Sequence, residues 1–120
     1  MKKSELEERL ISFSVSCIEI SRKMMDDKAG VHLMGQIIRS STSCALNYGE
    51  AQSGESRKDF IHKMKIVLKE LRESHVCLRI ILRSNLTDQN ERIERAITEA
   101  NELISIFVKS ISTAQSRMQT

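Results

Sequence analysis

The stretch RKDFIHKMKIVLKELRESHVCLRIILRSN, residues 57–85, decides the fold of this chain. Apolar or small side chains recur along it at alternating spacings of four and three, the pattern of a helix packed on other helices. Ser56 precedes the stretch and Asp59 follows three residues later, which is a shortened capping box. Asn85 suits a left-handed cap at the end. The stretch therefore predicts one long helix, whose packing seam contains Phe60, Met64, Val67, Leu71, Ser74, Leu78 and Ile81.

The composition limits the rest of the architecture. The chain has 120 residues, of which 40% are hydrophobic and 29% charged, so we expect one globular domain over residues 1–120. The absence of proline favours a few long helices joined by short connections. No apolar run approaches the length of a membrane span, and the N-terminus lacks the apolar stretch of a signal peptide. These features predict a cytoplasmic protein with no membrane association.

Three further helices are predicted around the long one. The first covers about residues 5–25 and has a capping box from Ser4 to Glu7. The second, at about residues 31–52, follows a turn that ends at Gly30, and its small side chains at 40–45 allow close approach and hydrogen bonds between helices. The last covers about residues 88–116, with Thr87 as its cap. Because the links are short, consecutive helices must run antiparallel, and the predicted fold is an all-α, up-down-up-down four-helix bundle.

Positive charge is concentrated on one face of the long helix. Residues 56–85 contain eight Lys or Arg and three Asp or Glu, a net +5 in a chain whose total is +3. Two adjacent rows on this face, opposite the seam, hold six cations and no acid. We call these six residues the basic stripe: Lys58, Lys65, Lys69, Arg72, Arg79 and Arg83. Such a row can bind phosphate backbones, or it can be the solvated face of an amphipathic helix. With only 3% aromatic residues to stack on bases, any binding should be weakly sequence-specific.

The apolar arc of the long helix is wider than the interior of one bundle requires. One flank of the seam carries Ile61, Leu68 and Leu82, and the other carries Ile66 and Ile80. Part of this arc should reach the outside and pack against another copy, although helices one and four could also wrap further round and cover it. The predicted oligomer interface consists of Ile61, Leu68 and Leu82.

The sequence contains no arrangement typical of an enzyme or a metal site. Di-iron bundles use Glu-x-x-His pairs, and the nearest approach here is a single Asp59-x-x-His62. No phosphate-binding glycine loop, nucleophile elbow or zinc motif occurs. Cys17, Cys44 and Cys77 lie at or beside apolar helical positions, which predicts buried free thiols. We expect no catalytic residue, no metal and no cofactor.

A discontinuous motif across the second and third helices resembles that of a known family. Its parts are N-Y-x-E-A, S-x-x-D-F-x-x-K and K-E-x-x-E, beginning at Asn47, Ser56 and Lys69. The pattern is similar to that of the bacterial four-helix-bundle proteins named after the 23S rRNA intervening sequence, and it covers about half of the chain. Cys77 stands where an aromatic residue is usual, and Leu46 where a smaller one is usual, so packing near the seam should differ.

The resemblance implies an antiparallel bundle that assembles as a ring, commonly a homopentamer, with a poorly defined function in most members. A related branch serves diversity-generating retroelements, in which a basic bundle pentamer binds nucleic acid beside a reverse transcriptase. The polar residues of the motif could form a catalytic cluster, but we expect them to set helix register or close the ring. Asp59 is expected to pair with Lys63, and Glu70 or Glu73 to reach the second helix or a neighbouring copy. The motif residues are Asn47, Tyr48, Glu50, Ser56, Asp59, Phe60, Lys63, Glu70 and Glu73.

Together these features predict a non-enzymatic, homo-oligomeric (pentameric) scaffold that binds nucleic acid, structured RNA in particular, through the basic stripe. The expected partners are further copies of the chain and RNA or DNA. The alternative is a protein–protein adaptor that docks a partner enzyme such as a reverse transcriptase and has no direct nucleic-acid role.

Overall fold

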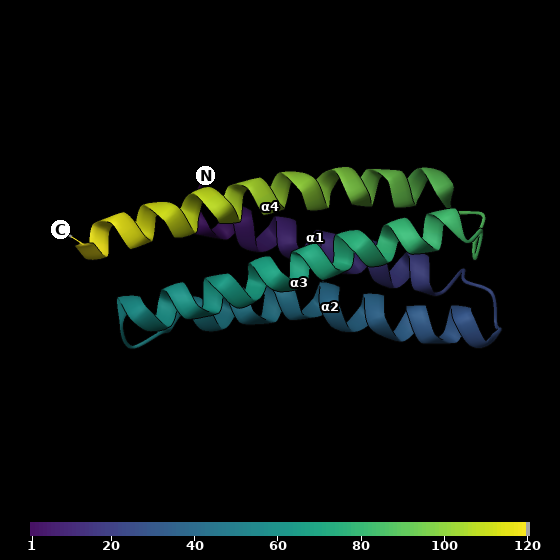
Figure 1. The fold of residues 1–120 in the computed structure, drawn as a ribbon, viewed down its shortest axis with the longest axis horizontal. Helices are drawn as coiled ribbons and strands as arrows, with labels where there is room; N and C mark the ends of the chain where they lie inside the picture. Colours follow the sequence, from purple (N-terminus) through teal and green to yellow (C-terminus); the bar gives the residue numbers. More distant parts are fainter. Residues whose placement is uncertain (120) are drawn as a thin grey trace.

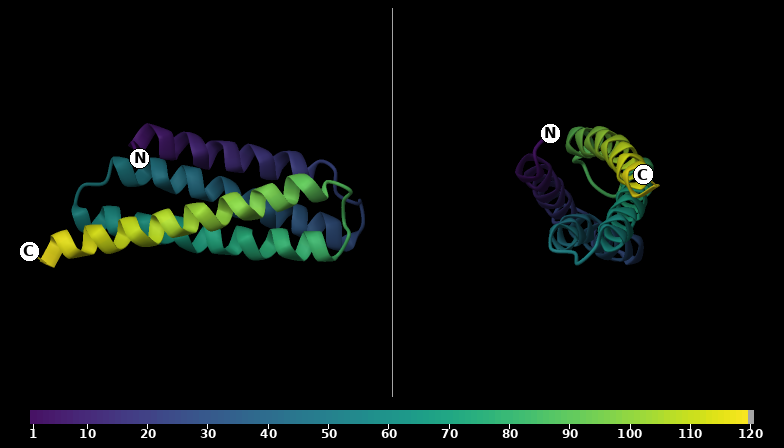
Figure 2. Two further views of the ribbon diagram at one scale, coloured as in Figure 1. Left: turned by 90° about the horizontal axis from the view of Figure 1, so that it is seen from above. Right: turned by 90° about the vertical axis from the view of Figure 1, so that its left-hand side faces the viewer.

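The computed structural model describes residues 1–119 and contains four helices, α1 (Lys3–Ser21), α2 (Lys28–Gln52), α3 (Arg57–Arg83) and α4 (Asn90–Gln119). They form an elongated bundle of 51 × 21 × 21 Å, in which each helix runs antiparallel to the next (Figure 1). Among the described residues, α1 and α3 each pack on α2 and α4, whereas the backbones of the diagonal pairs do not approach each other. This arrangement, seen end-on in Figure 2, confirms the predicted all-α, up-down four-helix bundle.

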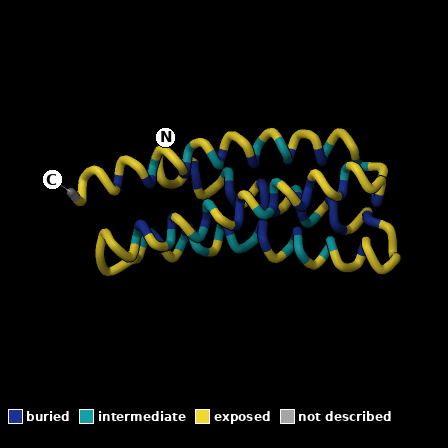
Figure 3. Tube along the Cα trace, viewed as in Figure 1, coloured by how far each residue is buried: buried dark blue, intermediate teal, exposed yellow. Residues whose placement is uncertain are grey.

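The core runs along the whole bundle, with buried positions on the inward side of every helix (Figure 3). Six of the seven seam residues of α3 are buried, and only Phe60, near one end, is partly exposed. In the interior, the ring of Tyr48 from α2 meets the ring of Phe107 from α4 edge-to-face, with centroids 5.7 Å apart. The predicted seam is therefore confirmed as the centre of the core.

Buried serines join the helices where their side chains are smallest. The Ser74 hydroxyl of α3 donates to the Ser40 hydroxyl of α2 at 2.8 Å, and the Ser14 hydroxyl of α1 donates to the Ser41 carbonyl at 2.8 Å. All four serines are buried. The small residues of α2 thus permit close packing and satisfy polar groups across the gap, as expected.

Of the caps predicted for the long helix, the Asn85 cap and the Ser56 half of the capping box are present, but within residues 1–119 the Asp59 carboxylate does not bond back to a backbone N–H. The Ser56 hydroxyl accepts a hydrogen bond from the Asp59 backbone N–H at 3.1 Å. Asn85 has a φ of 53°, in the left-handed region that asparagine tolerates better than most residues. These two contacts are local in sequence, which is why they could be predicted without knowledge of the packing.

Two other predicted caps were wrong. α1 begins at Lys3, so Ser4 already lies inside the first turn and cannot cap it, and the N-cap residue Lys2 makes no side-chain capping bond. Thr87 accepts from the Gln89 N–H at 3.3 Å and shapes the preceding turn, while α4 begins only at Asn90. In both places the helix begins at a different residue from the predicted one, so the predicted side chain is not at the capping position.

We predicted that the first connection ends at Gly30. This was wrong, because Gly30 lies inside the first turn of α2. That helix begins earlier than expected because Asp27 caps it, its carboxylate accepting from the Gly30 N–H at 2.7 Å. A Cβ atom at Gly30 would lie 1.9 Å from the Met25 carbonyl oxygen. Glycine is therefore required here by a close approach of the backbone from the preceding turn.

We expect Gly30→Ala to lower the free energy of unfolding by about 2–3 kcal/mol, because the turn must move and the Asp27 cap is disturbed. Gly35→Ala is the matched control, since a Cβ there meets nothing within 4 Å. In that exposed helical position alanine should instead add about 0.5–1 kcal/mol. Urea unfolding followed by circular dichroism measures both changes. Effects of the same sign would contradict the assigned role of Gly30.

Candidate nucleic-acid interface

The six cations of the basic stripe are all exposed on the outer side of α3. From Lys58 to Arg83 the stripe extends about 37 Å at 1.5 Å per residue. Within residues 1–119, none of the six forms an ion pair with an acidic side chain. Lys63 lies on the same helix outside the stripe and is paired, with its Nζ 3.4 Å from Oε2 of Glu50 on α2. The stripe is thus a line of uncompensated positive charge.

A groove between α3 and α4 borders the middle of the stripe. It has a volume of 490 Å³, and Lys65, Lys69 and Arg72 of α3 line it together with Ser112 and Gln115 of α4. Its remaining lining is apolar, and no acidic residue lines it. The groove adds neutral hydrogen-bonding groups beside three cations, a combination that suits the phosphates and sugars of a nucleic-acid backbone.

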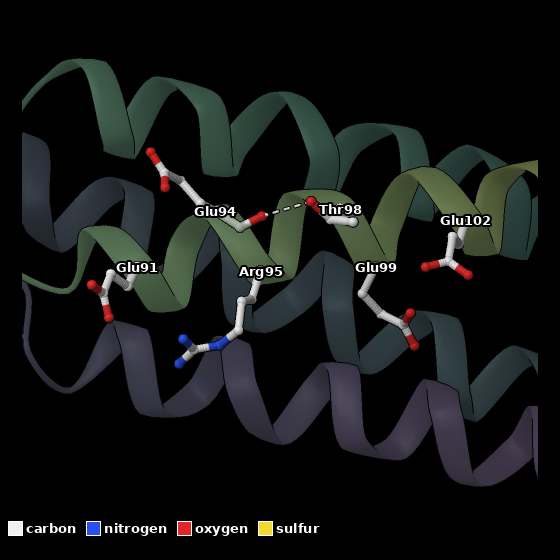
Figure 4. Close-up of a pocket in the computed structure, with 6 residues that line it drawn as sticks. All are labelled: Glu91, Glu94, Arg95, Thr98, Glu99 and Glu102. Carbon is white, nitrogen blue, oxygen red and sulfur yellow. Dashed lines mark hydrogen bonds between the residues drawn. The ribbon is translucent and has the colours of Figure 1, made fainter.

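Acidic side chains gather on another face, along α4. Glu91, Glu94, Glu99 and Glu102 lie near Arg95 around a shallow pocket of 410 Å³ (Figure 4). Two of these carboxylates, Glu99 and Glu102, pair with Arg9 of α1.

The Arg9 pairing is bidentate and joins α1 to α4. Its Nε and Nη2 donate to the two carboxylate oxygens of Glu99 at 2.9 and 2.5 Å, and Nη2 lies 3.4 Å from Glu102. The hydrogen bond to Glu99 raises the pKa of the Arg9 guanidinium above its ordinary value. The exposed carboxylates of α4 repel a polyanion, whereas the cations of the basic stripe attract it. A polyanion should therefore approach the bundle at α3.

Two acidic motif residues hold α2 against α3. Glu70 is 5% exposed, and its Oε2 accepts from Nη1 of Arg39 on α2 at 2.8 Å. Arg39 also pairs with Glu73. Both acids therefore reach the second helix, one of the two destinations expected for them. This half-exposed arginine compensates a buried carboxylate, whose charge would otherwise be costly in the core.

The other motif residues also make structural contacts. The Asn47 amide donates to the Ser43 carbonyl and hydroxyl of its own helix, both at 2.9 Å. Tyr48 is 3% exposed in the core, and its burial raises the pKa of its hydroxyl. The expected Asp59–Lys63 pair was wrong, because the short link brings Glu50 at the end of α2 beside Lys63 instead.

The residues predicted to form an oligomer interface are less available than expected. Ile61 is 7% exposed and belongs to the core, and Leu68 and Leu82 are partly buried against it. This corrects the expectation that Ile61 reaches the outside. Ile80, on the opposite flank, is 45% exposed, and Val76, which lies between Lys69 and Arg83 in a row of the basic stripe, is 50% exposed.

The exposed flank borders a second groove, of 520 Å³, between α2 and α3. Val76, Ile80, Cys77 and Leu33 form its apolar part, and its polar lining residues are His32, Gln36, Glu73 and Arg72, the last a member of the basic stripe. We call it the α2/α3 groove. It is a more accessible apolar surface than the flank that the heptad pattern selected.

The three cysteines are buried free thiols, as predicted. Burial raises the pKa of Cys17 to about 12 and that of Cys77 to about 11, and it raises the pKa of Cys44 as well. His75 is affected oppositely, since burial and the nearby Arg79 lower its pKa. Within residues 1–119, no three His, Cys, Asp or Glu side chains gather in a way that could hold a metal ion. None of the helices there is long and apolar enough to cross a membrane.

We expect all three thiols to react slowly with iodoacetamide at pH 8 in the folded protein. The reactive species is the thiolate, and a pKa near 11 leaves only about one thiol in a thousand ionised at that pH. Cys77, whose pKa is raised least, should react first, and all three should react rapidly in urea. Mass spectrometry of timed samples measures the order. Rapid labelling of Cys17 in the folded state would contradict the assigned burial.

Two features of the site were not anticipated from the sequence. One is the role of Arg39, although it is the single Lys or Arg in residues 29–56, which is a weak signal of a specific partner. The other is the contribution of Ser112 and Gln115 to the α3/α4 groove. Neither residue type nor spacing indicates it, because it depends on how α4 lies beside α3.

Comparisons with known proteins agree with this architecture. The family model described as 23S rRNA-intervening sequence protein matches residues 2–109. A solved structure from Bacteroides thetaiotaomicron, described as a protein with unknown function from the S23 ribosomal protein family, is similar with a TM-score of 0.83. It is 27% identical in sequence, and the match covers 93% of this chain and 99% of that chain. The comparison with curated proteins found no match.

Proposed function

We propose a function for this chain, which belongs to the 23S rRNA-intervening sequence protein family. It is a non-enzymatic, homo-oligomeric scaffold that binds structured RNA through the basic stripe. One observation carries the proposal. Six exposed cations follow one face of α3, and none has an acidic partner within residues 1–119. Cations that are neither buried nor paired cost little to bring against phosphate.

The proposed mechanism is contact with the phosphate backbone. Each lysine or arginine that neutralises a phosphate releases a condensed counterion, so affinity should fall steeply as salt rises. In a ring of identical copies the stripe would repeat, and weak contacts would add through avidity. The shape of the RNA, rather than its base sequence, would determine which molecules bind.

The test is titration of the purified protein with a short RNA hairpin across a salt series, with its mass in solution measured alongside. Binding that weakens steeply with salt supports the proposal, and the slope counts the phosphates contacted. Absence of binding at low salt, from a well-formed oligomer, would reject it.

The oligomer in this proposal is supported by the α2/α3 groove. Its exposed Val76 and Ile80 offer a second copy an apolar surface between two rigid helices. The resemblance to the family supports a closed ring, and five copies in particular. When each copy contacts the next through two different surfaces and the rotation between copies closes, the copies form a ring.

We expect Ile80→Glu to convert the oligomer to monomers, because a buried, unpaired carboxylate at each contact opposes association. Leu46→Glu is the matched control, since Leu46 is an exposed apolar residue of α2 that does not line the groove. Size-exclusion chromatography with light scattering measures the mass of each variant. Monomers from the unmutated protein, or an intact Ile80→Glu oligomer, would reject the assigned interface.

The second candidate function is the adaptor, and the same groove favours it. An exposed apolar groove between two helices fits a helix of a partner enzyme such as a reverse transcriptase. In that case Ile80→Glu would abolish capture of the partner while leaving the mass of the protein unchanged.

A further inference from the structure

A second cationic site lies at the end of the bundle where α1 and α3 begin. An open cavity of 820 Å³ is lined there by Met1 and by residues of α1, α3 and the last turns of α4. Figure 2 shows that α4 extends beyond the first residue of α1, so that these turns lack a neighbour on one side. No residue of the basic stripe lines this cavity, which is therefore a separate site.

The charges around the cavity converge from three helices. Lys3 of α1, Arg57 of α3 and Lys109 of α4 line it, as does Arg117, and no acidic residue does. Lys3, Arg57 and Lys109 form no ion pair within residues 1–119. Several cations around one cavity favour a ligand with more than one negative charge. A phosphate monoester, which carries about −1.5 to −2 at neutral pH, fits better than a single carboxylate.

Part of the lining of the cavity is apolar. Phe60, which is partly exposed, lines it with Leu6 and Ile106, and Ser110 and Thr113 also belong to the lining. An exposed aromatic ring is a stacking surface for a planar base, and hydroxyls can bond to a sugar. The volume is also in the range of small-molecule sites.

We propose that this cavity binds a nucleoside phosphate, with the phosphate on Arg57, Lys3 and Lys109 and the base against Phe60. The ligand is either a free mononucleotide or the phosphorylated end of an RNA strand, which present the same chemistry. The site shares no residue with the basic stripe, so the experiment that tests it can fail while the proposed function is upheld, and the reverse.

Calorimetric titration with adenosine 5′-monophosphate tests the proposal, with inorganic phosphate and adenosine as comparison ligands. The monophosphate should bind more tightly than either. Arg57→Ala and Lys109→Ala should each weaken its binding by about tenfold, the loss of one charge-assisted hydrogen bond. Phe60→Leu should reduce its affinity to that of inorganic phosphate. Circular dichroism melting establishes that each variant is folded.

Lys28→Ala is the control, because it removes the same charge at an exposed position outside both the cavity and the basic stripe. No saturable binding of the monophosphate, or an equal loss in Lys28→Ala, would overturn the proposal. The source of the ligand is then assigned by competition with one RNA strand carrying either a 5′-phosphate or a 5′-hydroxyl. Stronger competition by the phosphorylated strand supports a strand end, and equal competition supports the free nucleotide.

Discussion

Combining Lys65→Glu with Arg72→Glu should lower the affinity for an RNA hairpin by at least about a hundredfold. Both cations are exposed at the centre of the basic stripe and line the α3/α4 groove. If each lost phosphate contact costs roughly tenfold, or about 1.4 kcal/mol, the pair accounts for this factor before any repulsion is added. Fluorescence anisotropy of a labelled hairpin at low salt measures the change. The slope of log affinity against log salt should become shallower by about 2, one unit for each lost contact.

The control for this prediction is Lys23→Glu combined with Lys28→Glu. It changes the net charge by the same amount at exposed positions near the α1–α2 connection that do not belong to the stripe or line the α3/α4 groove. We expect little change in affinity or slope. If the two double variants weaken binding equally, RNA responds to the total charge of the protein and not to the stripe. If neither weakens it, the stripe is a solvated face. Light scattering should give the same mass for both variants.

Phe107→Ala should lower the free energy of unfolding by about 3–5 kcal/mol, the usual cost of removing a buried aromatic side chain. Phe107 is fully buried and meets Tyr48 across the bundle at 5.7 Å. The backbones of α2 and α4 lie too far apart to collapse into the space left behind, so a cavity should remain. Because domains of this size are stable by only about 5–15 kcal/mol, we expect the variant to melt many degrees below the parent protein.

Val108→Ala is the neighbouring control, since Val108 is 43% exposed on the same helix. It should cost well under 1 kcal/mol, as surface substitutions generally do. Urea unfolding followed by far-ultraviolet circular dichroism gives both values. A loss at Phe107 no larger than that at Val108 would show that the Tyr48–Phe107 contact does not hold the interior together.

The features that could be predicted depend on neighbours close in sequence. A 3.6-residue repeat places the seam of α3 on one side of the helix whatever packs against it, and six of its seven residues are buried. The same geometry places the basic stripe on the opposite, exposed side. The caps at Ser56 and Asn85 involve contacts within a few residues, so residue type and spacing were sufficient for them.

The features that could not be predicted depend on distances between helices. The heptad pattern placed Ile61 and Ile80 in one apolar arc, but the packing of α2 and α4 decides that Ile61 is buried while Ile80 is exposed. The same holds for Lys63, which pairs with Glu50 across a helix connection rather than with the nearer Asp59. Heptad position therefore identified the apolar arc correctly but not the part of it that reaches solvent.

By itself, the sequence determined the number and order of the helices, the buried seam and the line of positive charge on α3, because these follow from local periodicity. Only the tertiary structure decided that Arg39 compensates Glu70 and Glu73, since both acids lie more than 30 positions after Arg39 in the chain. It also decided that Gly30 admits no side chain and that cations from three helices meet at one end of the bundle. Those contacts form because packing the seams fixes the offset between helices, and no repeat within a single helix records that offset.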